Sequence, residues 1–182
     1  MLTQLRRSVV LALVFAVLCG IVYPVVEVGL SNVLFPSQAQ GSLISNGSIE
    51  IGQSWSGTKW FHGRPGTYND TATGGTNLGP RSRTLLDNTK KLVAFWHSVG
   101  VTPTQELVTT SGSQVDPDIS PRSAYVQIPM VSKATGISAS RLRSLVKSQI
   151  SGPQYGIFGD RFVNVLKLND SLARLEGVPV KG

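Results

Sequence analysis

The sequence predicts a single N-terminal transmembrane helix followed by a small α+β (mixed α/β) extracytoplasmic domain. First, residues 8–26 contain no charged side chain, and a helix of this length extends about 28 Å, close to the hydrocarbon thickness of a bilayer. Second, the rest of the 182 residues mixes helical and strand-like patterns and is long enough for one domain with its own core. Third, basic residues precede the apolar segment and are absent just after it, which indicates the side on which the domain lies.

The apolar segment sets the boundaries of the predicted parts. It continues almost without interruption to Leu34, and Pro36 should end the helix because proline lacks the N–H that a helix interior needs. We expect a cytoplasmic leader at 1–7, a transmembrane helix at 8–34 and an extracytoplasmic domain at 35–182. Two other interpretations stay open, namely a secretory signal cleaved near 37–39 and the core helix of a soluble protein. The run is longer than the core of a signal peptide, which favours the anchor.

The charges on either side of the helix predict its orientation. Arg6 and Arg7 lie in the leader, whereas residues 27–58 contain no Lys or Arg. Basic flanks of a membrane helix stay in the cytoplasm. We therefore expect a single-pass protein of the inner (plasma) membrane, with its N-terminus in the cytoplasm and its C-terminal domain outside. A domain in that location has no access to cytoplasmic ATP.

The charge of the predicted domain is positive but dispersed. All of the 17 basic and 10 acidic residues follow residue 35 except Arg6, Arg7 and Glu27, which leaves a net charge of +6. Nucleic-acid binding is not expected, because the basic residues are scattered and the domain is predicted to lie outside the cytoplasm. Attraction to lipid headgroups and an ordinary charged surface both explain the charge. Cys19 is the only cysteine, which excludes a disulfide within the chain and a thiolate metal cluster.

The first half of the domain is predicted to consist of turns and short strands. Residues 36–47 form a polar connector, and the pairs Asn46-Gly47 and Ser56-Gly57 are typical of turns. Strands are expected between these signals at 43–44, 48–51 and 59–62. Residues 68–80 (YNDTATGGTNLGP) should form a loop, because Gly-Gly and Gly-Pro pairs do not fit a regular element.

Helical spacing follows this loop. The apolar residues between Leu85 and Val99 recur at helical intervals, which predicts a helix over 83–99 that ends before Gly100. A strand is expected at 105–110 and a turn-rich loop at 111–121 (SGSQVDPDISP). Ser120 and Pro121 should begin the next helix, which Pro129 should interrupt after two turns before a short continuation ends at Gly136.

The last third of the chain should contain one helix and the strongest strand. Ser138 is predicted to cap a helix whose buried face consists of Leu142, Leu145, Val146 and Ile150. A loop at 152–159 and a strand at 162–168 (FVNVLKL) follow. From Asn169 the sequence is polar, and we expect it to fray after Val178.

Two loops contain residues that could bind a ligand. Loop 73–80 (TGGTNLGP) is rich in glycine, but it lacks the Gly-Lys-Ser/Thr ending of a P-loop, and no strong strand precedes it. A tight structural loop that packs on a partner is favoured over a phosphate cradle. Asp116 and Asp118 could bind a cation, but no third acidic residue follows at the spacing of a calcium loop. Turn and helix-start roles account for both aspartates.

The sequence contains no convincing catalytic constellation. His62 and His97 lack metal-ligand spacing, and the Ser-x-x-Lys matches at Ser56 and Ser144 lack their companion motifs. We therefore expect no enzyme activity, no catalytic residue and no metal site. One aromatic cluster has two explanations of equal weight, core packing or a surface at headgroup level or in a protein interface; its members are Trp55, Trp60, Phe61 and Tyr68.

Six segments, read together, resemble one protein family. They are LFPSQAQGSLI (34–44), WFHGRP (60–65), TGGTNLGP (73–80), VTTSGSQVDPDISP (108–121), YVQIP (125–129) and FVNVLKLN (162–169). Their order and spacing resemble the C subunit of the potassium-transporting P-type ATPase of the Kdp complex (the KdpC family), essentially from end to end.

The resemblance implies an accessory role in an inner-membrane complex that imports potassium against its gradient. In this family a channel-like subunit selects the ion, a P-type ATPase subunit hydrolyses ATP and a small single-span subunit assists. The C subunit is needed for assembly and activity. ATP and potassium would be handled by the complex, and this chain would carry no cofactor of its own. The alternative that the resemblance implies is a catalytic chaperone that binds nucleotide itself and increases the ATP affinity of the ATPase subunit, which conflicts with the predicted outside location.

We expect the domain to dock on the channel-like subunit near the potassium entrance, with membrane lipid as its other partner. The two loops rich in Gly, Pro and Asp carry the strongest part of the resemblance and are assigned to the docking surface. The candidate docking residues are Gly74, Gly75, Asn77, Leu78, Gly79, Pro80, Asp116, Pro117, Ser120 and Pro121. An anchored hydrolase and a sensor or adhesion module without a transport partner are further hypotheses.

Overall fold

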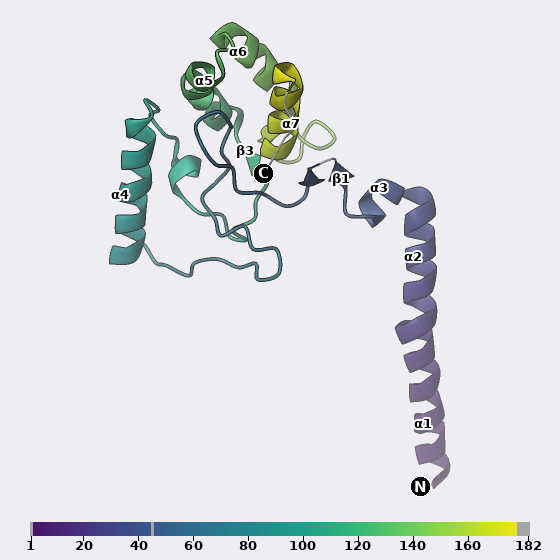
Figure 1. The fold of residues 1–182 in the computed structure, drawn as a ribbon. Helices are drawn as coiled ribbons and strands as arrows, with labels where there is room; N and C mark the ends of the chain where they lie inside the picture. The colour runs from purple at the N-terminus through teal and green to yellow at the C-terminus, as the bar shows by residue number, and fades with distance from the viewer. Residues whose placement is uncertain (1, 45, 178–182) are drawn as a thin grey trace. The chain divides into compact units, whose positions relative to one another are not determined.

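The computed structural model describes residues 2–44 and 46–177 (Figure 1). The chain divides into two compact units, Met1–Leu43 and Ile44–Gly182. The predicted fold class is confirmed in its architecture, since one long apolar helix is followed by a small domain that mixes helices and sheet.

The first unit is dominated by one long helix. It consists of α1 (Leu2–Val17), the π-helical turn η1 (Leu18–Val22) and α2 (Tyr23–Leu34), and none of these stretches has a buried residue. Together they form a helix of 33 residues that is long and apolar enough to cross a membrane. The predicted span of 8–34 lies within this helix, which already begins at Leu2 because no residue of the short leader breaks it.

The π-turn of this helix is explained by Pro24. The backbone N–H of Tyr23 donates to the carbonyl of Leu18, five residues earlier. In an α-helix it would donate to the carbonyl of the residue four positions earlier. Because Pro24 has no N–H, the carbonyl of Gly20 loses the donor that it would have in an α-helix. The wider turn at 18–22 lets the helix pass this position without a sharp break.

The long helix ends at Leu34, two residues before Pro36. Phe35 has a φ of −137°, outside the helical range, and Pro36 then begins the short helix α3 (Pro36–Ala39). Part of the predicted connector is therefore helical, because proline fits the first turn of a helix. The strands β1 (Leu43–Ile44) and β2 (Gly47–Ser48) form a two-stranded sheet. The first was predicted, and the second begins one residue earlier than expected and is shorter.

The core of the second unit lies between three helices and a small antiparallel sheet. The strands β3 (Asp118–Ile119), β4 (Ile150–Ser151) and β5 (Phe162–Asn164) have the order β3-β5-β4, and Val163 on the central strand pairs with Ile119 and with Ile150. The helices α5 (Pro121–Thr135), α6 (Ala139–Ser148) and α7 (Val165–Glu176) lie together beside the sheet (Figure 1). Fully buried core side chains include Phe61, Ile128, Leu142, Val163 and Leu172.

The helix α4 (Arg83–Ser98) lies apart from these helices (Figure 1). It confirms the helix predicted at 83–99, and Gly100 follows it with a φ of +77°, a conformation that favours glycine. Trp96 is the only residue of α4 that is buried. Its indole N–H donates to the carbonyl of Leu107 at 3.0 Å, whereas Leu86, on the same apolar pattern, is 53% exposed.

The strand predicted at 59–62 is wrong, because two side-chain amides replace a neighbouring strand. The backbone N–H of Phe61 donates to Asn169 Oδ1 and its carbonyl accepts from Asn169 Nδ2, both at 2.9 Å. In the same way the N–H of His62 donates to Gln127 Oε1 at 2.8 Å, and its carbonyl accepts from Gln127 Nε2 at 3.0 Å. Asn169 and Gln127 are completely buried on α7 and α5. The segment therefore satisfies its backbone without a sheet.

Two predictions around α5 are also wrong. Residues 105–110 contain the 3₁₀-helix η2 (Gln105–Val108) and no strand, and the N–H of Leu107 donates to the carbonyl of Thr104. Pro129 does not interrupt α5, which continues to Thr135. A proline inside a helix costs about 3 kcal/mol, but the neighbouring Ile128, Met130 and Val131 are all buried. Each such side chain contributes about 1.5–3 kcal/mol on burial, so the packing outweighs the proline.

The strand predicted at 162–168 is correct only for Phe162–Asn164. The side chain of Asn164 accepts from the N–H of Lys167 at 3.1 Å and so caps α7, which begins at Val165. The segment expected to be a polar tail is helical as far as Glu176, and the expected fraying after Val178 lies outside the described residues. The caps predicted at Ser120 and Ser138 and the buried positions of Leu142 and Val146 are confirmed.

Candidate functional site

The two loops assigned to docking lie in contact with each other. The N–H of Gly74 donates to the carbonyl of Ser113 at 3.2 Å, and Gln114 Nε2 donates to the carbonyl of Gly74 at 2.7 Å. Loop 73–80 is otherwise exposed, except for the half-buried Leu78. The structure therefore brings the two predicted segments together through Gly74 and leaves the rest of the glycine-rich loop accessible.

Loop 111–121 is held by hydrogen bonds from its own side chains. Ser111 Oγ accepts from the N–H of Gln114 at 2.9 Å, Ser113 Oγ accepts from the N–H of Val115 at 3.2 Å, and Asp116 Oδ1 accepts from the N–H of Asp118 at 3.0 Å. Such local bonds fix the backbone of turns. The loop therefore has a defined shape before any partner binds.

Two glycines from earlier in the chain, Gly52 and Gly66, lie directly against the backbone of this loop. The N–H of Gly52 donates to the carbonyl of Val115 at 2.7 Å, and a Cβ on Gly52 would lie 2.6 Å from the carbonyl oxygen of Asp116. A Cβ on Gly66 would overlap the carbonyl oxygen of Gln114. Only glycine permits this close approach of two backbones.

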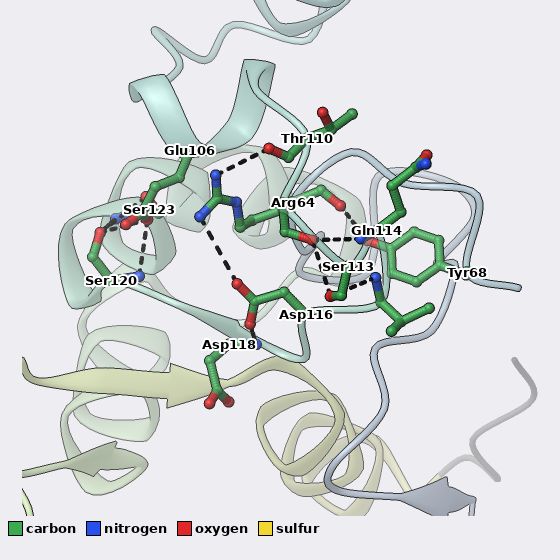
Figure 2. A network of polar contacts seen from close by, with 12 residues as sticks. Arg64, Tyr68, Glu106, Thr110, Ser113, Gln114, Asp116, Asp118, Ser120 and Ser123 are labelled. Carbon is green, nitrogen blue, oxygen red and sulfur yellow. Dashed lines mark hydrogen bonds and ion pairs between the residues drawn. The ribbon is translucent and has the colours of Figure 1, made fainter. Parts of the chain in front are cut away.

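Arg64 connects the residue before the loop to the middle of the loop (Figure 2). Its guanidinium donates through Nη2 to the carbonyl of Thr110 at 3.2 Å, and Nη1 lies 3.8 Å from Asp116 Oδ2. Arg64 Nε is buried and has no hydrogen-bond partner among the described residues. Sequence reasoning missed Arg64 as a site residue, although it belongs to the WFHGRP segment that carries the resemblance.

Glu106 accepts hydrogen bonds from the serine hydroxyls at the start of α5. One carboxylate oxygen accepts from the N–H of Ser120 at 2.9 Å, from Ser120 Oγ at 2.8 Å and from Ser123 Oγ at 2.5 Å. Partial burial alone would raise the pKa of Glu106, but these hydrogen bonds and the charge of Arg64 outweigh burial and lower the pKa. The carboxylate also lies near the positive end of the α5 dipole. No local sequence signal points to Glu106, because these partners are 14 and 17 positions away.

Tyr68 and Asp118 complete the polar network in Figure 2. The hydroxyl of Tyr68 donates to the carbonyl of Arg64. Burial, with a smaller contribution from the charge of Asp116, raises the pKa of Tyr68 to about 12, so the phenol stays neutral. Burial also raises the pKa of Asp118, with help from the nearby carboxylates and against the hydrogen bond from Asn164.

The remaining predicted docking residues have structural roles. The carbonyl of Pro117 accepts a hydrogen bond from the N–H of Val165 at 3.0 Å. Ser120 caps α5, and Pro121 is its first residue. All four predicted residues from 116 to 121 are half-buried. The second loop thus forms a rigid support, and loop 73–80 offers the more accessible groups.

The aromatic cluster is explained by core packing. Trp55, Trp60 and Phe61 are buried, and the rings of Trp55 and Trp60 lie 5.4 Å apart. The headgroup or interface explanation is therefore wrong for these three residues. Burial also lowers the pKa of His62, although a hydrogen bond to the carbonyl of Gly57 opposes the change. The ring of His62 meets that of Trp96 edge-on at 5.6 Å.

The network holds the backbone of loop 111–121 in shape through hydrogen bonds. Among residues 2–44 and 46–177, no group of three His, Cys, Asp or Glu side chains is placed to hold a metal ion. The carboxylates of Glu106 and Asp116 accept hydrogen bonds from protein donors. Between β2 and loop 73–80 the structure has no strand that would lead into the glycine-rich loop. The arrangement can present one exposed loop on a fixed base.

Comparisons with known proteins identify similar chains along nearly the whole sequence. Residues 5–174 match the family model described as KdpC, the K⁺-transporting ATPase c chain. A protein of Methylobacterium nodulans named potassium-transporting ATPase KdpC subunit is 40% identical over 97% of this chain and 100% of its own length. Proteins with the same name from Rhodopseudomonas palustris (42% identity, 94% of this chain and 97% of the relative) and Bradyrhizobium diazoefficiens (40%, 96% and 98%) are similar to the same extent.

Proposed function

The chain belongs to the KdpC family, the c chain of the K⁺-transporting ATPase, and we propose that it is a non-catalytic accessory subunit that docks its C-terminal domain on the channel-like subunit of the complex. In this proposal the docked domain lies near the potassium entrance and is needed for assembly and activity. The P-type ATPase subunit and the small single-span subunit are the other protein partners, and the long apolar helix contacts lipid.

The observation that carries the proposal is the pairing of an exposed loop with a rigid support. Gly74 is fastened to Ser113 and Gln114, while the adjacent residues up to Pro80 remain accessible apart from Leu78. A surface that is already ordered loses little conformational entropy when it binds. Asn77 has a φ of +55°, which sharpens the turn of this exposed segment.

The proposed orientation rests on the distribution of positive charge around the helix. Arg6 and Arg7 lie near the N-terminal end of the helix, and no basic residue follows the helix before Lys59. Under the positive-inside rule the N-terminus lies in the cytoplasm and the domain outside, in the inner membrane. Potassium approaches an importer from that side, whereas ATP is supplied from the other.

Removal of two side chains of loop 73–80, the exposed Asn77 and the half-buried Leu78, tests the docking proposal. We expect the double variant Asn77→Ala and Leu78→Ala to release the subunit from the purified complex and to abolish potassium-stimulated ATPase activity. The matched control Leu86→Ala and Asn88→Ala removes the same side chains from α4 and should leave the complex intact. The Tm of the isolated subunit distinguishes lost docking from lost folding. An intact and fully active complex with the loop variant would contradict the proposal.

The location of the domain decides between this proposal and its alternative, a catalytic chaperone that binds nucleotide and increases the ATP affinity of the ATPase subunit. Gly112 is exposed and a Cβ there meets no other atom within 4 Å. We expect Gly112→Cys, in a Cys19→Ser background, to react in intact cells with a thiol reagent that does not cross the inner membrane. Protection in intact cells, together with labelling of the subunit by an ATP photoprobe, would favour the nucleotide-binding alternative.

A further inference from the structure

A short hairpin between β4 and β5 exposes three large apolar side chains. The N–H of Gln154 donates to the carbonyl of Phe158 at 2.8 Å, and the N–H of Phe158 donates back to Gln154 at 3.0 Å. Within this turn Tyr155 is 86% exposed, Ile157 76% and Phe158 63%. No other large apolar side chain in the described part of 46–177 is as exposed. Adjacent exposed apolar groups of this kind mark a contact site.

The positive charge of the domain is concentrated in the segment that ends with this hairpin. Residues 119–161 contain six basic side chains and one acidic side chain, Asp160, whereas the rest of 36–182 contains nine basic and eight acidic residues. The six basic residues are all exposed; they are Arg122, Lys133, Arg141, Arg143, Lys147 and Arg161. This segment therefore carries most of the net positive charge of the domain on exposed side chains.

Two of these cations line a groove at the base of the hairpin. Lys147 and Arg161 border a space of about 530 Å³ whose other walls are Pro121, Tyr125, Ile150 and Gly152. Gly152 and Arg161 flank the hairpin in the sequence, so the groove begins where the hairpin leaves the domain. Arg143 lies 5.6 Å from the ring centre of Tyr125, on the same wall.

We propose that this hairpin inserts into the headgroup region of an anionic phospholipid bilayer, with Lys147 and Arg161 binding lipid phosphates. The apolar tip and the cationic groove match the two chemical parts of such a lipid. Three side chains that bury at most about 150–250 Å² each fall short of the roughly 800 Å² per partner in a stable protein interface. A bilayer needs no such matching surface. The inference is independent of docking through loop 73–80.

The depth of a spin label tests the insertion. The full-length chain, with Cys19→Ser and Ile157→Cys, is labelled and reconstituted into vesicles that contain phosphatidylglycerol. We expect the label to be accessible to oxygen and protected from a water-soluble nickel complex. A label at Asn88→Cys, an exposed position on α4, should show the opposite pattern. Equal exposure of both labels to the nickel complex would overturn the proposal.

The roles of the two cations are tested in the same vesicles. Each basic side chain near an anionic surface strengthens attachment by about fivefold, so Lys147→Gln with Arg161→Gln should weaken insertion by about 25-fold. Lys90→Gln with Lys91→Gln, which removes the same charge from the exposed surface of α4, should change nothing. Insertion of equal depth in vesicles of zwitterionic phosphatidylcholine alone would refute the assigned dependence on anionic lipid. Protection that appears only in the assembled complex would identify a protein partner and also refute the proposal.

Discussion

The side chain of Asn169 makes both backbone hydrogen bonds of Phe61, with each donor 2.9 Å from its acceptor. Both residues are completely buried, so neither bond can be replaced by water. One amide from the last helix thus holds a segment more than one hundred residues earlier in the chain, and that segment leads directly to Arg64 and the loops of the candidate site.

Replacement of Asn169 should therefore unfold the domain at a lower temperature. Asn169→Leu leaves two buried backbone groups without partners, which costs about 3 kcal/mol and lowers Tm by about 9 °C for a chain of this size. Thermal unfolding of the full-length protein in detergent, followed by near-UV circular dichroism, measures the change. Asn88→Leu, on the exposed surface of α4, should leave Tm within a degree or so.

Glu106 should make stability depend on pH in the acid range. The folded protein lowers the pKa of Glu106 below its ordinary value of 4.5, so its contribution is present above that value and is lost as the pH falls through the lowered pKa. At neutral pH Glu106→Gln should cost about 1 kcal/mol, after allowance for partial exposure. Urea unfolding at a series of pH values should show this difference shrink below pH 4.5. A constant difference at every pH would show that the charge is unimportant, and Asp70→Asn serves as the control carboxylate variant.

Arg64 should keep loop 111–121 closed. Arg64→Met removes the bonds to Thr110 and Asp116 while retaining much of the aliphatic packing. We expect amide exchange in residues 111–121 to become about fivefold faster, corresponding to about 1 kcal/mol, and exchange in α5–α7 to stay unchanged. Arg83→Met on α4 is the matched variant, and hydrogen–deuterium exchange with mass spectrometry is the measurement. Unchanged amide exchange in residues 111–121 would show that Arg64 does not stabilise this loop.

A methyl group at Gly66 should push loop 111–121 away from the segment that contains Gly66. Because a Cβ there would overlap the carbonyl of Gln114, Gly66→Ala should destabilise the domain by about 2 kcal/mol through forced backbone shifts. Gly112→Ala adds the same methyl group to open space and should be neutral. Tm and retention of the subunit in the purified complex are measured for both variants. Equal behaviour of the two variants would show that the close approach is dispensable.

The predictions from sequence were right where a local pattern determines the structure. The apolar run, the helical spacing of α4 and the serine caps of α5 and α6 each depend on residues within a few positions. The strand predicted at 59–62 was wrong because Asn169 and Gln127 occupy its hydrogen-bonding groups from distant helices. The strand predicted at 162–168 was too long because Asn164 caps α7, so the chain becomes helical at Val165.

The candidate site was only partly accessible to the same reasoning. Turn composition identified both loops, and the structure shows that Gly74 joins them. Arg64 and Glu106 were missed because their roles arise from partners that are separated from them along the chain and that become neighbours only in the fold. Whether loop 73–80 meets a partner stays a prediction, which the paired alanine variants test.

The π-turn at 18–22 affects how the chain tolerates changes of length. A turn with one additional residue rotates everything before it by about 100° relative to an uninterrupted α-helix. Deleting one residue there, together with Pro24→Ala, should restore regular α geometry and keep the two halves in phase. A deletion of one residue anywhere else in the span would misalign the two halves, so the loss of a residue from this helix is tolerated at one place and harmful at its neighbours.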